Sequence, residues 1–309
     1  MGKTYTTPTA FKTAIKQAAL NMSKKTGMSV PELQNVFYFN RLAARVFTAD
    51  PDGWLIKGGQ ALLVRYHGSA RLSRDLDLQS AAPDRTVEEA AQMLIKAATH
   101  DLGDFLRYAP GKFLPHGEEG RGGAQYFTVY VGNSKQADIK VDLVVGRTLA
   151  GTPETHPLTS AVDLQWPVDW PQVRLYPVID HVADKICAMY ERHGKGGSSR
   201  YRDLADLLLL SQQEHIDGKT VHDALHREAE RRRQLGTVLE LPKLFETPAP
   251  DWPDKYPEQA KLVLGLKGCQ QFAEAAAAVS TFIDPLLDGT VEGTWNPEEA
   301  QWLPVFDAS

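Results

Sequence analysis

The sequence contains little cysteine, no long apolar run and no strong excess of charge of either sign. Its two cysteines, Cys187 and Cys269, are isolated from each other and show no metal-ligand spacing, which argues against a disulfide framework and against a zinc site. No segment is long and apolar enough to span a bilayer, and residues 1–27 lack the apolar core of a signal peptide. We therefore expect a cytoplasmic protein with reduced cysteines and no membrane partner.

The overall composition is that of an ordinary globular protein. The 309 residues are 42% hydrophobic and 24% charged, and the formal net charge is -5 at pH 7. A chain of this length can form one large domain or two smaller domains with their own cores, and this composition excludes disorder as the main state. Because the net charge is negative, a polyanionic partner would have to bind a local basic patch.

The apolar pattern divides the chain into an α+β half and a mostly helical half. Helices are predicted at about 8–25, 30–47, 60–66 and 87–98, and strands at 54–57, 74–80, 125–131 and 137–145, the last two forming an antiparallel hairpin. A proline- and threonine-rich segment follows Gly146, and helical patterns lie beyond it at 178–193, 200–213, 220–234 and 268–287. We predict an α+β domain with N-terminal helices over residues 1–150, and a linker with an α-helical domain over 151–309.

Two aspartates interrupt one of the predicted strands. Asp75 and Asp77 are separated by a single residue, so their side chains point to the same side of the strand, with Cα atoms roughly 6.5 to 7 Å apart. Aspartate is depleted from strands, and a buried unpaired carboxylate is costly, so a cation, water at a sheet edge or a bound metal must compensate. Taken alone, such a pair is most often an exposed strand or turn feature.

A third aspartate, Asp142, lies in a later strand among apolar neighbours. If that strand is next to the first, three carboxylates converge and repel one another unless cations neutralise them. Magnesium prefers oxygen ligands, and two ions about 3.5 to 4 Å apart can activate a nucleophile and stabilise a leaving phosphate. The pattern therefore predicts a two-magnesium site.

A glycine pair, Gly58–Gly59, separates the first strand from the helix that follows it. Glycine pairs alone usually mark turns, but backbone amides at a helix N-terminus also bind phosphate. In the order strand, glycine pair, helix, acidic strand and later strand aspartate, these features together predict a site for a metal-bound phosphate.

At this point the residues resemble a known family. Residues 57–78 resemble the first motif of the DNA polymerase β-like nucleotidyltransferases, and within them of the AbiEii/MenT-type toxins of type IV toxin-antitoxin systems. Gly58–Gly59 and Ser73 match the glycine-serine part of that motif, although Gly68–Ser69 is an alternative match. Residues 140–146 resemble the strand that carries the third carboxylate. The helical motif of the family matches Lys185, Arg200, Arg202, Asp203 and Asp206.

The resemblance covers about residues 55–210 and implies a fold and an activity. The implied fold is an α+β polymerase β-like nucleotidyltransferase domain with a mixed or antiparallel sheet, followed by a mostly α-helical C-terminal domain that completes the active-site cleft. The implied activity is Mg²⁺-dependent transfer of a nucleoside monophosphate from a nucleoside triphosphate (NTP) to an RNA 3′ hydroxyl, at the acceptor end of tRNA. Such a toxin has a cognate antitoxin encoded nearby.

The resemblance also assigns roles to residues. The catalytic candidates are Asp75, Asp77, Asp142, Lys185 and Asp203, of which the first three are the metal ligands. The candidates for binding the triphosphate are Gly58, Gly59, Ser73, Lys185 and Arg200. Lys185 could instead be a lysine that extends from a helix edge to solvent, and Asp203 and Asp206 could form internal salt bridges with Arg200.

Two alternatives to an RNA-modifying toxin are open. One is a small-molecule nucleotidyltransferase, such as an aminoglycoside-modifying enzyme, and the other is a catalytically silent nucleotide-binding or partner-binding module. The basic residues that could contact RNA are Lys195, Arg200, Arg202 and Arg231 to Arg233. Runs such as the last are more often an exposed charged helix face.

Overall fold

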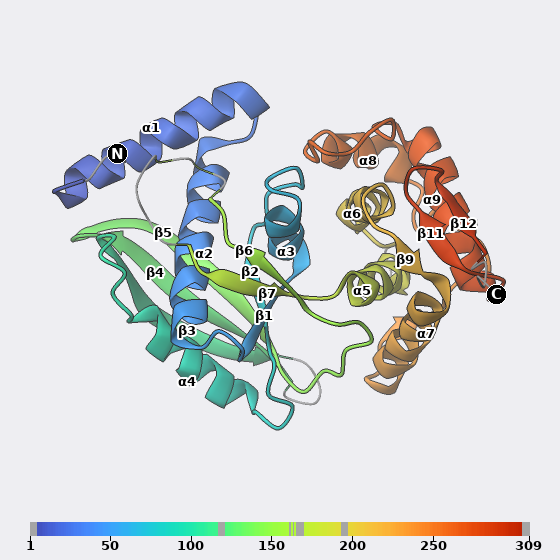
Figure 1. The fold of residues 1–309 in the computed structure, drawn as a ribbon, viewed down its shortest axis with the longest axis horizontal. Helices are drawn as coiled ribbons and strands as arrows, with labels where there is room; N and C mark the ends of the chain where they lie inside the picture. The colour runs from blue at the N-terminus through green and yellow to red at the C-terminus, as the bar shows by residue number, and fades with distance from the viewer. Residues whose placement is uncertain are drawn as a thin grey trace, which may run out of the picture. The chain divides into compact units, whose positions relative to one another are not determined.

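The computed structural model describes residues 5–116, 121–160, 162, 164, 170–192 and 197–304 (Figure 1). The chain forms two compact units. Unit 1 consists of Met1–Thr148 and Pro153–Tyr176, and unit 2 of Leu149–Thr152 and Pro177–Ser309. Among the helices of these described ranges, none is long and apolar enough to cross a membrane.

Unit 1 is built on a seven-stranded mixed sheet with the strand order β3-β4-β5-β2-β1-β7-β6. Its strands are β1 (Trp54–Lys57), β2 (Leu76–Ser80), β3 (Leu106–His116), β4 (Gly122–Val131), β5 (Ser134–Val144), β6 (Glu154–Pro157) and β7 (Gln172–Leu175). Strand β2 is parallel to β5, and β1 is parallel to β7, whereas the other neighbours are antiparallel. The central strands β2 and β5 therefore run in the same direction and end at the same edge.

Four helices complete unit 1, and their starts follow from capping residues. They are α1 (Pro8–Thr26), α2 (Val30–Ala49), α3 (Gly58–Arg65) and α4 (Val87–Ala98). Side-chain oxygens of Thr7, Ser29 and Thr86 accept hydrogen bonds from backbone N–H groups in the first turns of α1, α2 and α4. Helices α2 and α4 contact each other and pack on the sheet.

The alternation of residues in β2 and β5 decides which side chains enter the core. Leu76 and Leu78 on β2, and Val141 and Leu143 on β5, are fully buried. Because successive side chains of a strand point to opposite faces, the aspartates between these apolar residues point away from the core.

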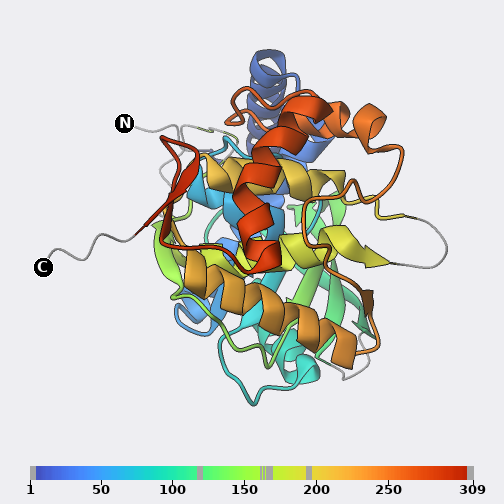
Figure 2. The same ribbon diagram turned by 90° about the vertical axis from the view of Figure 1, so that its right-hand side faces the viewer.

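Unit 2 is mostly helical (Figure 2). Its helices are α5 (Val178–Tyr190), α6 (Tyr201–Ser211), α7 (Gly218–Gln234), α8 (Trp252–Ala260) and α9 (Phe272–Asp288). Helix α5 packs on α6 and α7, and α9 packs on α6, α7 and α8. The short strands β8 (Glu191–Arg192) and β10 (Val238–Leu239) form one small sheet, and β9 (Ile216–Asp217), β11 (Thr294–Asn296) and β12 (Gln301–Leu303) form another.

The predicted α+β class, with a mixed sheet and a helical second half, is confirmed, and so is the predicted hairpin, which is β4 and β5. Strand β3 was not predicted, because Pro110 and Pro115 disfavour a strand. It lies at the edge of the sheet and has an irregular register between Pro110 and Phe113, where proline is tolerated. The segment after residue 150, predicted to be a linker, instead supplies strands β6 and β7 to unit 1, with β6 at an edge of the sheet and β7 between β6 and β1.

Candidate active site

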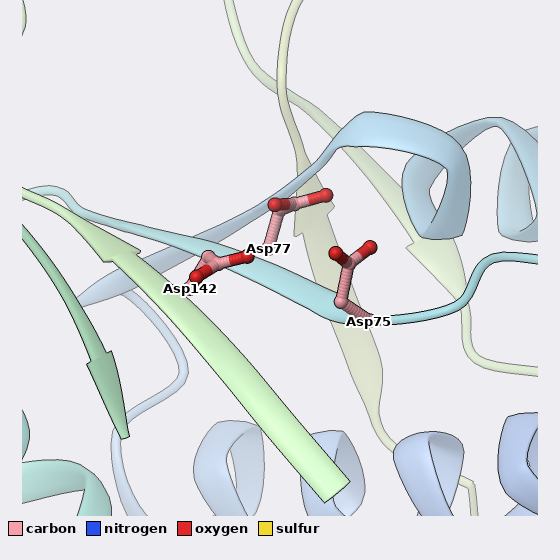
Figure 3. Close-up of side chains that lie close together, drawn as sticks. All are labelled: Asp75, Asp77 and Asp142. Carbon is pink, nitrogen blue, oxygen red and sulfur yellow. The ribbon is translucent and has the colours of Figure 1, made fainter. Parts of the chain in front are cut away.

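Three carboxylates converge on the outer face of the sheet in unit 1 (Figure 3). Asp77 on β2 is the register partner of Asp142 on the parallel strand β5, and Asp75 lies two residues earlier. One oxygen of each carboxylate lies within 4.8 Å of the others. Strand β2 begins at Leu76, so Asp75 directly precedes the strand that was predicted to start at residue 74, yet its carboxylate still reaches the cluster. The pairing of β2 with β5 adds the third carboxylate.

The glycine pair begins α3 directly beside this cluster. Lys57, the last residue of β1, is the register partner of Asp77, so the chain turns into α3 next to the Asp77 carboxylate. Gly58 has φ +60°, and a Cβ at this position would overlap Oδ2 of Asp77. Both the left-handed backbone and the close approach therefore require glycine here.

Ser73 joins the glycine pair to the acidic cluster. A Cβ on Gly59 would lie 3.3 Å from Ser73 Oγ, and the Ser73 hydroxyl donates a 3.4 Å hydrogen bond to Asp75 Oδ1. The first turn of α3 supplies backbone amides at the positive end of the helix dipole. Unit 1 thus brings together six of the predicted site residues, which are Gly58, Gly59, Ser73, Asp75, Asp77 and Asp142.

The electrostatics of the cluster are those of crowded negative charge. Burial and, to a smaller extent, the charges of Asp75 and Asp142 together raise the pKa of Asp77 to about 7, although Lys57 and Lys140 act in the opposite direction. A carboxyl group with this pKa is partly protonated near neutral pH, because the metal-free cluster contains too little positive charge to keep three carboxylates ionised.

Lys140 supplies part of that positive charge. Its Nζ lies 2.6 Å from Asp142 Oδ2 and 3.4 Å from Asp75 Oδ2. Burial lowers the pKa of Lys140, but its hydrogen bond and charge interaction with Asp142, together with those with Asp75, outweigh this effect and raise the pKa. Lys140 was not among the predicted site residues, although the period-two rule that paired Asp75 with Asp77 also places it on the face of Asp142.

Arg71 is a second basic residue that was not predicted. A Cβ on Gly59 would lie 3.3 Å from its Nη1, at the same distance as from Ser73 Oγ. The guanidinium group therefore lies beside the first turn of α3. Arg71 precedes Ser73 by only two residues, but a single arginine in a loop does not by itself indicate a binding site.

The cluster fits a divalent cation. Three carboxylates offer the hard oxygen ligands that Mg²⁺ prefers, and their mutual repulsion would be relieved by positive charge. Asp75 and Asp142 retain 33% and 20% exposure of their side chains, so water and phosphate oxygens could complete the coordination.

The remaining predicted residues with described positions lie in unit 2, where Lys185, Arg200, Asp203 and Asp206 form a cluster of charges. Lys185 on α5 is 5% exposed, and its Nζ lies 3.1 Å from Asp203 Oδ1 and 2.5 Å from Asp206 Oδ2. Arg200, which is largely exposed, pairs with the other oxygen of Asp203 at 2.6 Å. The alternative in which Lys185 extends into solvent is therefore wrong. Asp203 forms the salt bridge expected with Arg200, whereas Asp206 pairs with Lys185.

The three arginines of the run on α7, Arg231 to Arg233, all form ion pairs. Arg232, with 15% of its side chain exposed, contacts Glu228, Glu191 and Asp184. Arg231 binds Glu228, and Arg233 pairs with Glu230. The partly exposed Arg231 and Arg233 agree with the interpretation of the run as an exposed charged helix face, whereas Arg232 is largely buried among its carboxylate partners. Two other candidates give no support for an RNA surface, because Arg202 donates to Gln259 and Lys195 lies outside the described residues.

Comparisons with known proteins identify the family. The family model of the nucleotidyl transferase AbiEii toxin of type IV toxin-antitoxin systems matches residues 41–278. This range includes both clusters of predicted site residues. No curated protein matches the chain significantly.

A solved structure shows the same fold. MenT4, a nucleotidyltransferase toxin from Mycobacterium tuberculosis H37Rv, is 14% identical, with a TM-score of 0.50 over 87% of this chain and 97% of that chain. A protein from H. pylori, described as a candidate nucleotidyltransferase, is 16% identical, with a TM-score of 0.43 over 87% of this chain and 97% of that chain. The chain therefore belongs to the AbiEii family, the nucleotidyl transferase toxins of type IV toxin-antitoxin systems, and is a nucleotidyltransferase.

Proposed function

We propose that this protein is a Mg²⁺-dependent toxin that transfers a nucleoside monophosphate from an NTP to an RNA 3′ hydroxyl, at the acceptor end of tRNA. The hydroxyl oxygen forms a bond to the α-phosphorus, the bond from that phosphorus to the bridging oxygen breaks, and pyrophosphate and a proton are released. The observation that carries the proposal is the convergence of Asp75, Asp77 and Asp142 beside Gly58 in a chain of this family.

The aspartates have proposed roles as ligands of two Mg²⁺ ions. Asp75 and Asp77 would hold both ions, and Asp142 would be a further ligand of the ion that activates the acceptor hydroxyl. When bound, the ions lower the pKa of the attacking hydroxyl and neutralise charge on the transferred and leaving phosphates. In support, burial and the charges of Asp75 and Asp142 raise the pKa of Asp77, so added positive charge at the cluster would favour its ionised form.

Other residues hold the triphosphate in this proposal. The backbone amides of Gly58 and Gly59 and the Ser73 hydroxyl bind its oxygens, since they lie in the first turn of α3 and beside it. Lys185 and Arg200 contribute positive charge. Asp203 orients Lys185, to which it is hydrogen bonded.

A direct test is to incubate the protein with total RNA, Mg²⁺ and each of the four labelled NTPs. We expect RNA of tRNA size to take up label from at least one NTP, and the label to be lost in EDTA. The Asp77→Asn variant should be inactive although folded. The matched control is Asp138→Asn, which removes an exposed carboxylate from the same sheet face of β5, and it should remain active. Labelling by Asp77→Asn at the wild-type rate would refute the assigned site.

Two observations favour a second candidate, a nucleotidyltransferase with a small-molecule acceptor. The net charge is negative, and the arginines of α7 are engaged by carboxylates instead of being available to phosphates. RNA labelling should weaken steeply between 50 and 200 mM salt, as roughly expected for binding through several phosphates. Transfer to a small neutral acceptor would be much less sensitive to salt. Absence of RNA labelling with all four NTPs would favour this candidate.

The family also implies partners in the cell. We propose that the toxin acts in the cytoplasm, where tRNA and NTPs are found, and that a cognate antitoxin is encoded nearby. Expression of the wild type alone should arrest growth, and co-expression with the neighbouring gene should restore it. The Asp77→Asn variant should not arrest growth.

A further inference from the structure

The aspartate cluster already contains one cation, which belongs to the chain itself. Lys140 lies two residues before Asp142 on β5, so both side chains point to the same face of the sheet. Its ammonium group lies 2.6 Å from Asp142 and 3.4 Å from Asp75, within direct charge-assisted contact of Asp142. Two of the three carboxylates are therefore bridged by Lys140.

This ammonium group and a bound divalent cation would compete for the same carboxylates. A divalent cation at the cluster would bind carboxylate oxygens that accept hydrogen bonds from Lys140 Nζ. It would also place its two positive charges beside the single positive charge of Lys140. Like charges separated by a few ångströms in a partly buried site repel strongly. A fully loaded cluster with Lys140 still in its present place is therefore disfavoured.

Lys140 can leave without disturbing the core. Its side chain is 36% exposed, and lysine has a flexible four-carbon stem that can move its charge into water. By contrast, Lys185 is 7% exposed in its side chain and is held by two carboxylates. The two lysines thus differ in how easily they can change partners.

We propose that Lys140 is an exchangeable counter-ion of the aspartate cluster. In the metal-free protein it holds Asp142 and Asp75 together against their repulsion, and it leaves them when a divalent cation binds. This inference rests on the proposed function, since it requires a divalent cation at the cluster. Lys140 is then a positioning residue that sets the metal affinity of the site.

Calorimetric titration with Mn²⁺ alone, without nucleotide, tests this proposal. The Lys140→Met variant should bind Mn²⁺ at least about tenfold more tightly than the wild type, at the lower end of what a charge at this distance contributes. Lys140→Arg keeps the charge and should bind about as weakly as the wild type. The matched control is Lys135→Met on the same strand, where the lysine is exposed and pairs with Asp138, and its affinity should be unchanged.

Thermal unfolding in EDTA gives a second measurement. Without metal, Lys140→Met should melt at a lower temperature than the wild type, because the cluster has lost its counter-ion. Mn²⁺ should raise the melting temperature of Lys140→Met by more than it raises that of the wild type. A wild type that binds no Mn²⁺ would refute the proposed metal site itself. Mn²⁺ binding by the wild type, with equal or weaker binding by Lys140→Met, would overturn only the role of Lys140. If Lys140→Met does not fold, tighter binding by Lys140→Arg would overturn it as well.

Discussion

Replacing Asp77 with asparagine should stabilise the metal-free protein at pH 8. The Asp77 side chain lies between Asp75 and Asp142 in the cluster, and its pKa in the folded chain is about 7, against 3.8 for an unperturbed group. Between these pH values the folded chain binds more protons than the unfolded chain. The free energy of unfolding therefore falls as pH rises from about 4 to about 7.

The size of the effect follows from the same two pKa values. A difference of about three pH units is worth about 4 kcal/mol, at roughly 1.4 kcal/mol per unit. Because Asp75 and Asp142 are partly exposed, water screens the repulsion, and we expect about 2 kcal/mol. Asparagine removes the charge at nearly constant volume, so this amount should reappear as a gain in stability at pH 8, and the gain should be much smaller at pH 4.5, just above the unperturbed pKa of 3.8.

Urea unfolding in EDTA, followed by circular dichroism at pH 4.5 and pH 8, measures this gain. The matched control is Asp138→Asn, because the pKa of Asp138 is lowered by its hydrogen bonds to Lys135 and Thr128. The control should therefore gain no stability at pH 8. Mg²⁺ should stabilise the wild type at pH 8 and should stabilise Asp77→Asn far less. An Asp77→Asn protein that is no more stable than the wild type at pH 8, or that gains equally at both pH values, would show that burial and charge repulsion do not destabilise the ionised Asp77 carboxylate.

Three further predictions concern backbone geometry and buried charge. Gly58→Ala should lower the free energy of unfolding by about 2 kcal/mol or more, because alanine is strained at φ +60° and its Cβ would overlap the Asp77 carboxylate. Unfolding of Gly27→Ala measures the cost of the backbone conformation alone, because Gly27 has φ +73° and open space around it. Asp104→Ala should lower the free energy of unfolding in urea by about 3 to 5 kcal/mol, because it removes the carboxylate that pairs with the buried Arg41 and Arg45. A loss below about 1 kcal/mol would mean that water stabilises the two guanidinium groups instead. Lys185→Met should lose stability because it removes the buried ammonium group that pairs with Asp203 and Asp206. Combining Lys185→Met with Asp206→Asn should recover part of that stability, and a purely additive double variant would contradict the pairing.

Much of the active site was predictable from the sequence because its signals are local. The alternation of Leu76 and Leu78 with Asp75 and Asp77 fixed the face of the strand on which the carboxylates lie. The glycine pair between a strand and a helix indicated a turn with exposed amides, and Gly58 indeed has a left-handed backbone. Such features depend on neighbours within a few residues, and chain geometry alone decides them.

Other features depended on which strands become neighbours. The distance in sequence between Asp77 and Asp142 carries no information on their separation, and only the parallel pairing of β2 with β5 makes them register partners. The same pairing brings Lys140 to Asp75, which no motif indicated. Strands β6 and β7 lie in a segment rich in proline that was predicted to be a linker, and β6, which contains Pro157, is at the edge of the sheet, where proline is tolerated.

The clearest division between sequence and tertiary structure is seen in the basic residues. The sequence determined that Lys185 and Arg231 to Arg233 lie on helices, since their apolar neighbours recur with helical period. Only the tertiary structure decided that Lys185 is buried between Asp203 and Asp206, and that Arg232 is enclosed by Asp184, Glu191 and Glu228. The physical reason is that an ion pair depends on the distance between two side chains in space, and the packing of separate helices sets that distance. The helical period specifies only the side of the helix on which each side chain lies.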